Sequence, residues 1–335
     1  MAFSHIRPPM KAVLLVGGMG TRLRPLTYRV PKPLVPVMGK PLMMHVIDSL
    51  PDEVDETIVP VGYKREMMED YLRRNPPRRK ITIVEEKEPM GTGGAVKNVE
   101  DYIDGPFLVI NGDSISSLDM SRFIEYHREK KAFATISLWE VDDPTPFGVV
   151  DLDANGQIHR FQEKPSKMEA FSRLINAGAY ALEYEVLDYI GKGFVSMERE
   201  VFPQIVEKGM YGLRFDGHWV DCGTRENLLN AFWTLMRERI DENVGNGLHD
   251  SSIALPAVVE DGADITDAII GPYAYISKGT VVGPSTKVEG SVIYPDSRVG
   301  RGCTIKNSII DVGVTVPDGT VVSDTIVSNA VSPAE

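Results

Sequence analysis

The chain has 335 residues, of which 42% are hydrophobic and 25% are charged, a composition typical of a globular protein with a substantial core. Its formal net charge of −12 argues against a general nucleic-acid-binding protein, because affinity for a phosphate backbone requires a basic face. The two cysteines, Cys222 and Cys303, are far apart in the sequence and form neither a disulfide framework nor a zinc spacing, which favours a reducing, cytoplasmic compartment.

The first segment of the chain, residues 1–9, is expected to be a short extension, because "MAFSHIRPP" lacks the apolar core of a signal peptide. No run of about 18 apolar residues occurs in the sequence, so we expect no membrane partner. From Met10 to about Ile240, strand-like runs such as "KAVLLV" and "GPFLVIN" alternate with helical stretches. This alternation predicts an α/β domain with a mostly parallel sheet, to which we assign residues 10–247.

The first strand-like run leads into a glycine-rich turn, "VGGMGTRLRP". A dinucleotide-binding fingerprint would need a third glycine where Leu23 stands, and a P-loop would need Gly-Lys followed by Ser or Thr. The bare backbone can instead approach a polyphosphate, and Arg22 and Lys32 follow closely enough to neutralise it. Arg24 and Arg29 are interpreted as charges that only add to the positive field. The turn therefore predicts a nucleoside triphosphate site formed by Gly17, Gly18, Gly20 and Thr21.

After about Leu248 the helical pattern ends, and β-branched residues recur every six or five positions from Ile253 to Val322. Two spacings of six and one of five separate Ile276 from Ile293, and the same total interval separates Val282 from Val299. Such an interval suits one coil of a three-sided solenoid with glycines and other turn formers at its corners. A β-sandwich of short strands is the alternative, but its strands would show no fixed coil length. We therefore predict a parallel β-helix domain over residues 248–335.

The segment "GGMGTRLRPLTYRVPKPLVPV" resembles the signature of the sugar-1-phosphate nucleotidylyltransferases. Further segments match the family in the same order, namely "EPMGTGG", "VINGDS", "FGVV", "FQEKP", "NAGAY" and "HWVDCGT". The resemblance covers the whole chain and implies a Rossmann-like nucleotidyltransferase domain followed by a left-handed β-helix of hexapeptide-type repeats. It also implies an enzyme that joins a nucleoside triphosphate to a sugar 1-phosphate and releases pyrophosphate. Together with "SMEREVFP", these segments look most like mannose-1-phosphate guanylyltransferases.

The resemblance assigns catalytic roles to three cations. Arg22 would contact the triphosphate, since a planar guanidinium can hold two oxygens and stabilise the charge of the leaving pyrophosphate. Lys32 lies between two prolines, which fix its backbone and aim its ammonium group. Lys164 of "FQEKP" would hold the phosphate of the sugar. The alternative for Arg22 and Lys32 is a solvent-exposed surface position.

Two aspartates are the expected ligands of a magnesium ion. Asp113 of "VINGDS" follows a buried strand, and ligands of open α/β sheets gather beyond the carboxyl ends of the strands. By resemblance, the second ligand is Asp221 of "HWVDCGT". Mg²⁺ takes hard oxygen ligands and bridges substrate phosphates, usually with one or two protein carboxylates. A turn or capping role is the alternative for either aspartate alone.

Three segments predict the sugar side of the site. Gly148 of "FGVV" would bring bare backbone close to the hexose, with strand packing as the alternative. Glu163 would accept hydrogen bonds from sugar hydroxyls while Lys164 holds the phosphate, or the two would form a surface ion pair. Asn176 of "NAGAY" can both donate to hydroxyls and accept from them, with a turn asparagine as the alternative.

The residue five positions before Gly91 bears on the choice of base. Many uridylyl- and thymidylyltransferases of the family have a glutamine there, whereas this chain has Glu86. A carboxylate only accepts hydrogen bonds, and guanine presents two neighbouring donors that it can accept together. We therefore favour GTP, with Gly91 and Thr92 completing the nucleotide site. A small shift in alignment would give the role to Glu85 or Glu88, and a glucose-1-phosphate uridylyl- or thymidylyltransferase is the alternative.

The expected reaction needs no general base, because the sugar phosphate oxygen that attacks the α-phosphorus is already anionic. A second, acyltransferase activity in the β-helix would need a histidine base, and the last histidine, His249, precedes the solenoid proper. The β-helix is therefore expected to be structural or to form a homo-oligomer. A catalytically silent paralogue that binds nucleotide sugars is the alternative of another class, but no motif position is degraded.

Overall fold

The computed structural model describes residues 10–238 and 247–331, so the predicted extension over residues 1–9 lies outside the described residues. By its internal contacts the chain divides into two compact units. The first unit comprises Met1–Gly18 and Met43–Trp219, and the second comprises Met19–Leu42 and Val220–Glu335. The glycine-rich turn therefore begins in the first unit and ends in the second. The predicted domain boundary between residues 247 and 248 stays a prediction.

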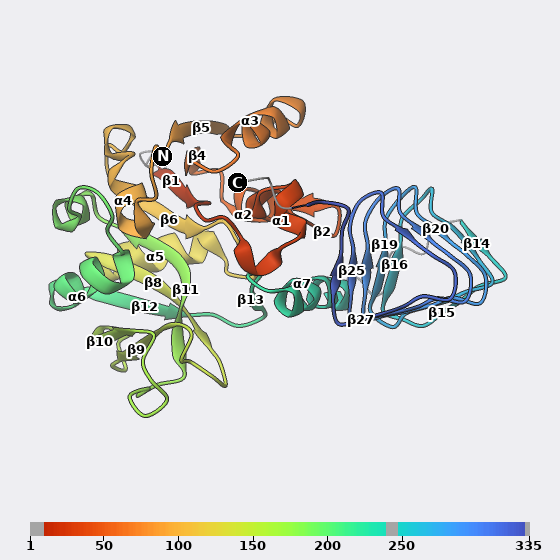
Figure 1. Cartoon of the computed structure of the whole chain (residues 1–335). Coiled ribbons are helices and arrows are strands. Elements are labelled where there is room, and N and C mark those ends of the chain that lie inside the picture. Colours follow the sequence, from red (N-terminus) through yellow and green to blue (C-terminus); the bar gives the residue numbers. More distant parts are fainter. Residues whose placement is uncertain (1–9, 239–246, 332–335) are drawn as a thin grey trace, which may run out of the picture. The chain divides into compact units, whose positions relative to one another are not determined.

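The first unit is built on a nine-stranded sheet (Figure 1). Its strands are β1 (Met10–Leu15), β4 (Val54–Val61), β5 (Lys80–Glu85), β6 (Phe107–Asn111), β8 (Ala134–Glu140), β9 (Gly148–Leu152), β10 (Ile158–Glu163), β11 (Leu174–Leu182) and β12 (Met210–Arg214). β6, β1, β4 and β5 are parallel neighbours in that order, while β11 is antiparallel to β6, β8 and β9. Since β12 is parallel to β8 and β10 antiparallel to β9, seven of these nine described strands point in one direction, which confirms the mostly parallel sheet.

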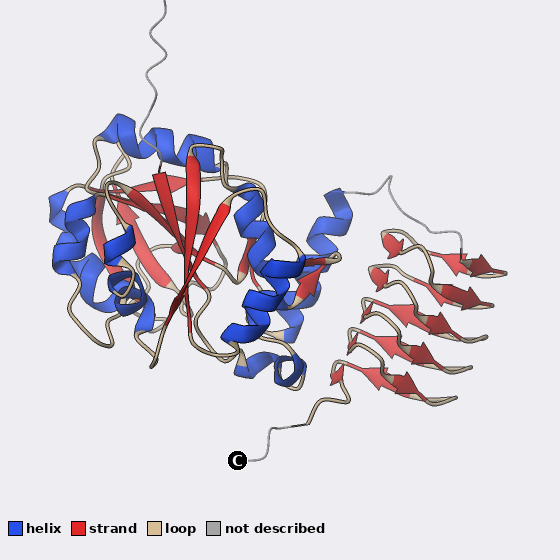
Figure 2. Cartoon of the chain, turned by 90° about the horizontal axis from the view of Figure 1, so that it is seen from above, coloured by secondary structure: helices blue, strands red, loops and turns tan. Residues whose placement is uncertain are grey.

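Helices flank this sheet on both sides (Figure 2). They are α2 (Leu42–Ser49), α3 (Arg65–Arg74), α4 (Gly91–Lys97), α5 (Met120–Lys130) and α6 (Phe202–Ile205), with the shorter turns η3 (Glu100–Tyr102), η4 (Tyr184–Tyr189), η5 (Met197–Val201) and η6 (Val206–Lys208). α5 begins where the Asp119 side chain accepts a hydrogen bond from the backbone N–H of Arg122 at 3.0 Å. Among the described residues, no helix is long and apolar enough to cross a membrane.

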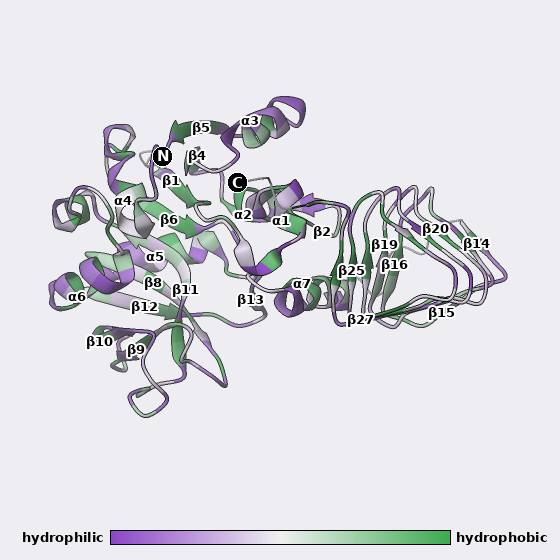
Figure 3. Cartoon of the chain, viewed as in Figure 1, coloured by the Kyte–Doolittle hydropathy of each residue, from purple (hydrophilic) through white to green (hydrophobic). Residues whose placement is uncertain are grey.

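The core of the first unit lies on the central strands, and β1 and β6 are strongly apolar in Figure 3. Val13, Phe107 and Tyr180 are fully buried there, and the ring of Tyr180 packs against Phe202 of α6 with 5.0 Å between centroids. Side chains buried on both faces hold these strands rigid. The loops that follow their carboxyl ends therefore begin at fixed positions. Those segments carry several of the predicted site residues.

The second unit contains a stack of three parallel five-stranded sheets. Their strands are β14 (Leu248–His249), β17 (Asp264–Thr266), β20 (Val281–Val282), β23 (Arg298–Val299) and β26 (Thr315–Val316) in one sheet; β15 (Ser252–Ile253), β18 (Ile269–Ile270), β21 (Lys287–Glu289), β24 (Thr304–Lys306) and β27 (Val321–Ser323) in the next; and β16 (Ala257–Val259), β19 (Ala274–Ile276), β22 (Val292–Ile293), β25 (Ile309–Ile310) and β28 (Ile326–Val327) in the third. Figure 2 shows the coils stacked one on another. This arrangement confirms the predicted β-helix and is consistent with the left-handed, hexapeptide type.

The predicted coil length is also confirmed. Ile276 pairs with Ile293 in the next coil, and paired residues elsewhere in the stack are separated by the same number of positions. The exception is the pairing of β18 with β21, where Ile270 and Val288 are separated by one position more. The β-branched residues that set the period point inward and form one buried core. One corner turns through left-handed backbone at Gly279, Asp296 and Gly313, which occupy the same place in successive coils.

The second unit also contains the signature segment Met19–Leu42 and one long helix. Its remaining elements are η1 (Thr21–Leu23), α1 (Leu26–Arg29), η2 (Lys32–Leu34), β2 (Pro36–Val37), β3 (Lys40–Pro41), β13 (Trp219–Asp221, where the chain enters this unit) and α7 (Arg225–Glu238). Phe232 of α7 packs on Tyr275 and Tyr294 of the solenoid, with ring centroids 5.0 Å and 6.4 Å away. The hydroxyl of Tyr294 donates a hydrogen bond to the carbonyl oxygen of Pro36 at 2.7 Å. One face of the β-helix is thus covered by the signature segment and α7.

Candidate active site

The glycine-rich turn follows β1 and has backbone that other residues adopt only with strain. Gly18 has φ 114° and Gly20 has φ 61°, both in the left-handed region. A Cβ at Gly18 would have no atom within 4 Å, whereas one at Gly20 would lie 2.9 Å from Thr27 and 3.1 Å from Lys32. Gly18 leaves its backbone open to a ligand, and Gly20 allows the turn to pack closely against the segment that follows it.

Glu86 lies beside this turn within the first unit. It follows β5, and its backbone N–H donates to the carbonyl oxygen of Val61 at 3.0 Å. A Cβ at Gly17 would be 3.6 Å from Oε2 of Glu86, while Oε1 accepts a hydrogen bond from the N–H of Met90 at 2.9 Å. One carboxylate oxygen is therefore engaged, and the other lies toward the glycine turn with its acceptor capacity left. Glu85 and Glu88 are exposed, whereas Glu86 is half-buried.

Gly91 and Thr92 open α4, and the structure gives both a packing role. Gly91 has φ 69°, and a Cβ there would meet the carbonyl oxygen of Val195 at 2.6 Å. The hydroxyl of Thr92 donates to Oε2 of Glu198 at 2.7 Å and accepts from the N–H of Met197 at 2.9 Å. The "GTGG" sequence thus lets α4 approach the 193–198 segment closely, and a nucleotide contact by either residue stays a prediction.

Three of the predicted sugar-binding residues lie together in the first unit. Gly148 of β9 pairs with Glu163 of β10, and a Cβ at Gly148 would meet Phe161 at 2.5 Å and Glu163 at 2.9 Å. Lys164 has φ 46°, its N–H donates to the carbonyl oxygen of Phe147 at 2.9 Å, and its Nζ lies 3.7 Å from Oε1 of Glu163. A side chain at position 148 would collide with Phe161 and Glu163, so the glycine leaves the space that the Glu163 carboxylate occupies.

Asn176 of β11 is joined to a carboxylate that the sequence did not identify. Its Nδ2 donates to the hydroxyl of Tyr180 at 2.9 Å, and that hydroxyl donates to Oε1 of Glu198 at 3.1 Å. Since Oε2 of Glu198 accepts from Thr92, this one side chain links the segment of the nucleotide site to the sugar segment. Glu198 lies in the π-helical turn η5, a feature that is frequent at functional sites. The three charged residues 198–200 between apolar neighbours in "VSMEREVF" were the available signal.

The chemistry of Glu163 is altered by its surroundings. Burial, followed by the nearby Glu198 carboxylate, raises the pKa of Glu163 above its ordinary value, and the Lys164 ammonium opposes the shift. The folded protein therefore binds this proton more tightly than the unfolded chain does. The stability that the protonated form contributes is lost as the pH rises through the folded-state pKa, so at neutral pH the ionised carboxylate destabilises the protein.

Replacing Glu163 with glutamine should therefore stabilise the protein and impair it at the same time. We expect a higher melting temperature at pH 7, with the difference from wild type disappearing below about pH 4. We also expect kcat/KM for the sugar 1-phosphate to fall about 10- to 100-fold, because a charged acceptor is lost. Thermal unfolding followed by circular dichroism and steady-state kinetics measure the two effects. Glu207→Gln, at an exposed position of the same unit, is the control, and unchanged kinetics of Glu163→Gln would remove Glu163 from sugar recognition.

In the second unit, two of the three predicted phosphate-binding cations, Arg22 and Lys32, converge on Asp221. Nζ of Lys32 lies 3.7 Å from Oδ1 of Asp221, and the lysine side chain is only 11% exposed. A Cβ at Gly223 would lie 2.5 Å from Nη2 of Arg22 and 3.1 Å from Oδ1 of Asp221. The glycine of "HWVDCGT" therefore leaves room for the guanidinium beside the carboxylate. Within this unit the predicted catalytic cations and one predicted metal ligand form a single cluster.

The other two arginines of the signature segment, Arg24 and Arg29, each have a specific partner. Arg24 stacks on the ring of Tyr28 with 4.9 Å between its guanidinium carbon and the ring centroid. Arg29 forms an ion pair with Asp311 of the β-helix, with 2.6 Å between Nη2 and Oδ1. The interpretation of Arg29 as a charge that only adds to the field is therefore incomplete, because its side chain makes a specific contact.

Each of the two aspartates predicted as magnesium ligands offers the hard carboxylate oxygens that this ion prefers. Asp113 lies in the first unit between β6 and β7 (Ser114–Ser116), next to Gly112, whose N–H donates to Leu15 of β1 at 2.8 Å. Asp221 lies in the second unit. Among the described residues, no group of three or more His, Cys, Asp and Glu side chains forms a ready-made metal site. Mg²⁺ suits such a donor set, because it binds one or two carboxylates and completes its shell with phosphate oxygens and water. The pairing of the two aspartates stays a prediction.

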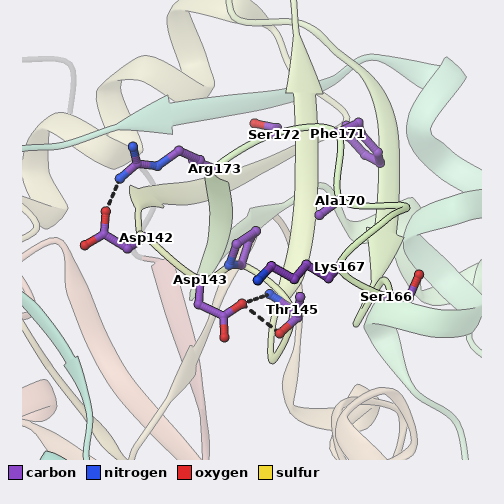
Figure 4. Close-up of a pocket in the computed structure, with 10 residues that line it drawn as sticks. Asp142, Asp143, Thr145, Ser166, Lys167, Ala170, Phe171, Ser172 and Arg173 are labelled. Carbon is purple, nitrogen blue, oxygen red and sulfur yellow. Dashed lines mark hydrogen bonds and ion pairs between the residues drawn. The ribbon is translucent and has the colours of Figure 1, made fainter.

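A pocket of about 780 Å³ lies on the loops on either side of the β9–β10 pair (Figure 4). Asp143 accepts hydrogen bonds from the N–H and hydroxyl of Thr145 at 3.1 Å and 2.8 Å, and these bonds lower the pKa of Asp143. Arg173 forms an ion pair with Asp142. These contacts fix the loops that precede Gly148 and follow Lys164, so the pocket lies next to the predicted sugar residues in the chain without containing them.

A glycine turn after the first strand of a mostly parallel sheet, with converging cations and a C-terminal β-helix, defines a nucleotidyltransferase architecture. Residues 11–238 match the nucleotidyl transferase family, and residues 240–327 match the family described as GlmU-like, C-terminal hexapeptide. The chain therefore belongs to the nucleotidyl transferase family and is an enzyme of that class.

Two kinds of relatives are similar to the chain over most of its length. The bifunctional protein GlmU of Methanocaldococcus jannaschii is 35% identical over 327 residues, which cover 90% of this chain and 77% of that protein. The probable mannose-1-phosphate guanylyltransferase 3 of Oryza sativa is 35% identical over 314 residues, which cover 90% of this chain and 86% of that protein. Among solved structures, HddC from Yersinia pseudotuberculosis is 32% identical with a TM-score of 0.57, covering 68% of this chain and 99% of that one.

Proposed function

We propose that the protein is a sugar-1-phosphate nucleotidylyltransferase that converts GTP and mannose 1-phosphate to GDP-mannose and pyrophosphate. Family membership supports the reaction class, and the guanylyltransferase relatives support the product. The observation that carries the choice of base is the half-buried Glu86 carboxylate next to Gly17 of the glycine turn, since guanine offers two neighbouring donors to such an acceptor. HddC, a similar protein, has been solved in complex with GMP-PN.

In the proposed reaction, an anionic oxygen of the sugar 1-phosphate attacks the α-phosphorus of the nucleotide in line. The bond between the α-phosphorus and its bridging oxygen breaks, and pyrophosphate leaves with the negative charge. Lys164 holds the attacking phosphate, while Arg22 and Lys32 stabilise the leaving group. Glu163 and Asn176 orient the sugar hydroxyls. Mg²⁺, held by Asp113 and Asp221, would neutralise phosphate charge. No residue needs to abstract a proton.

The test is a screen for pyrophosphate release. GTP, ATP, UTP, CTP and dTTP are each incubated with the 1-phosphates of mannose, glucose, N-acetylglucosamine and heptose, with Mg²⁺ present. We expect the highest kcat/KM for GTP with mannose 1-phosphate. A preference for UTP or dTTP would instead favour the second candidate, a uridylyl- or thymidylyltransferase, which the GlmU relatives support. No release with any pair, together with binding of a nucleotide sugar, would indicate a silent regulatory paralogue.

Replacing Glu86 with glutamine should weaken the preference for GTP. The amide N–H₂ would face one of the two guanine donors and leave buried donors unpaired, at a cost of about 1–3 kcal/mol. The ratio of kcat/KM for GTP over UTP should therefore fall about 10- to 100-fold. Glu207→Gln, at an exposed position of the same unit, is the control, and Glu88→Gln tests the alternative position. An unchanged ratio for Glu86→Gln would show that the base is recognised elsewhere.

We also propose a cytosolic enzyme that forms a homo-oligomer. The thiols of Cys222 and Cys303 are both buried, which suits a reducing compartment. Size-exclusion chromatography with light scattering measures the oligomeric state, and a monomer at assay concentrations would contradict the proposed oligomer.

A further inference from the structure

The β-helix makes a specific contact with the signature segment, through Arg29 and Asp311. Nη2 and Nε of the guanidinium donate to Oδ1 of Asp311 at 2.6 Å and 3.0 Å, and Nε also lies 3.2 Å from Oδ2. Arg29 ends α1, and Asp311 directly follows β25 of the solenoid. A planar guanidinium held by several such bonds has a fixed orientation as well as a fixed distance.

The carboxylate of Asp311 is buried, and both of its oxygens accept hydrogen bonds. Its side chain is 1% exposed, so an ionised group there needs several hydrogen bonds to replace the lost water. Besides Arg29, the backbone N–H of Val312 donates to Oδ1 at 2.8 Å, and the hydroxyl of Ser328 donates to Oδ2 at 2.7 Å. Both of these further donors belong to the β-helix. The solenoid therefore fixes this carboxylate independently of Arg29 and presents it to α1.

Helix α1 connects Arg29 to the glycine turn and to Lys32, the parts of the segment that are predicted to contact phosphate. The hydroxyl of Thr27, in the same helix α1, donates to the carbonyl oxygen of Gly20 at 2.8 Å. Lys32 follows shortly after Arg29 in η2, and a Cβ at Gly20 would lie 3.1 Å from the Cβ of Lys32. α1 is thus held at one end by the glycine turn and at the other by the β-helix. The position of Lys32 depends on both attachments.

We propose that Arg29 and Asp311 are a pair of positioning residues, through which the β-helix holds the signature segment so that Lys32 and Arg22 face the phosphates. The proposal rests on the proposed function and assigns the solenoid a direct part in nucleotidyl transfer. It differs from a role in stability alone, because the pair should act on turnover even when the variant is fully folded. It also differs from oligomer formation, since both residues are in one chain.

The experiment compares Asp311→Asn and Arg29→Met with the wild type at a temperature well below each measured melting temperature. Asp311→Asn keeps the size of the side chain; its amide oxygen can accept from the N–H of Val312 and its N–H₂ can donate to the hydroxyl oxygen of Ser328, so its fold should be retained. We expect kcat to fall about 10- to 100-fold in both variants, the scale of a misplaced catalytic group, while KM for the sugar 1-phosphate is unchanged. The double variant should lose no more than either single one, because the two residues act as one pair.

The matched control is a second ion pair on the same solenoid. Nε of Arg301 lies 3.1 Å from Oδ2 of Asp318, and both side chains are largely exposed. Arg301→Met removes an arginine from the β-helix without touching the signature segment, and we expect wild-type kcat from it. Hydrogen exchange should be faster over residues 26–35 in Asp311→Asn and unchanged over β1.

Three results would overturn the proposal. They are wild-type kcat in folded Asp311→Asn, an equal loss in Arg301→Met, and unchanged exchange over residues 26–35. If Arg29→Met does not fold, Arg29→Lys replaces it, because it keeps the charge but loses the forked geometry, and a smaller drop in kcat is then expected. A wild type that releases no pyrophosphate with any substrate pair would instead reject the proposed function, so the two failures are distinguishable.

Discussion

Replacing Arg22 with alanine should lower kcat about 10²- to 10³-fold, the usual loss for one preorganised donor that stabilises developing charge. The guanidinium lies beside Gly223 and Asp221 in the second unit, close to Lys32, so the variant removes one of two clustered cations. We expect the melting temperature to stay within a few degrees of wild type, because Arg22 is exposed. The measurement is kcat at saturating nucleotide and sugar 1-phosphate.

Two further variants show whether the position of Arg22 matters. Arg24→Ala removes the same charge two residues away, where the side chain stacks on Tyr28, and should leave kcat near the wild-type value. Gly223→Ala keeps every charged group but places a methyl where the Arg22 guanidinium now lies, and it should reduce kcat about as strongly as a misplaced catalytic group does. Equal activity of wild type and Arg22→Ala at saturation would remove Arg22 from the mechanism.

Replacing Asp113 or Asp221 with asparagine should raise the requirement for magnesium. An amide is a weaker ligand than a carboxylate for a hard cation, and loss of one of two protein ligands should raise the Mg²⁺ concentration for half-maximal activity by at least about tenfold. Both side chains are only half-buried, so we expect the variants to fold. The measurement is activity as a function of Mg²⁺ concentration at fixed substrate concentrations, with circular dichroism of each variant.

Asp151→Asn, at an exposed position of β9 in the first unit, is the control for the loss of one negative charge. If Asp113→Asn alone kept full activity at low magnesium, the metal would be held without it, and the same holds for Asp221→Asn. If the two aspartates share one ion, the double variant should require more Mg²⁺ than either single variant, because the ion has then lost both predicted protein ligands.

The sequence by itself determined the features that depend on local spacing. The β-helix could be predicted because each coil needs one inward β-branched residue per side, so that its period is visible in the chain, as in Ile276 and Ile293. The glycine turn could be predicted because left-handed backbone, as at Gly18 and Gly20, restricts the residue type. The family could be identified because these segments follow one another in a fixed order.

Only the tertiary structure decided which distant side chains act together. Arg29 and Asp311 are 282 residues apart, and nothing in either local sequence indicates that one is the partner of the other. Glu198 likewise joins Thr92 and Tyr180 only because α4, β11 and η5 pack against one core. A hydrogen bond or ion pair of this kind can exist only where the packed core brings the two backbone segments together. Its partners are therefore set by packing rather than by the period or spacing that a sequence displays.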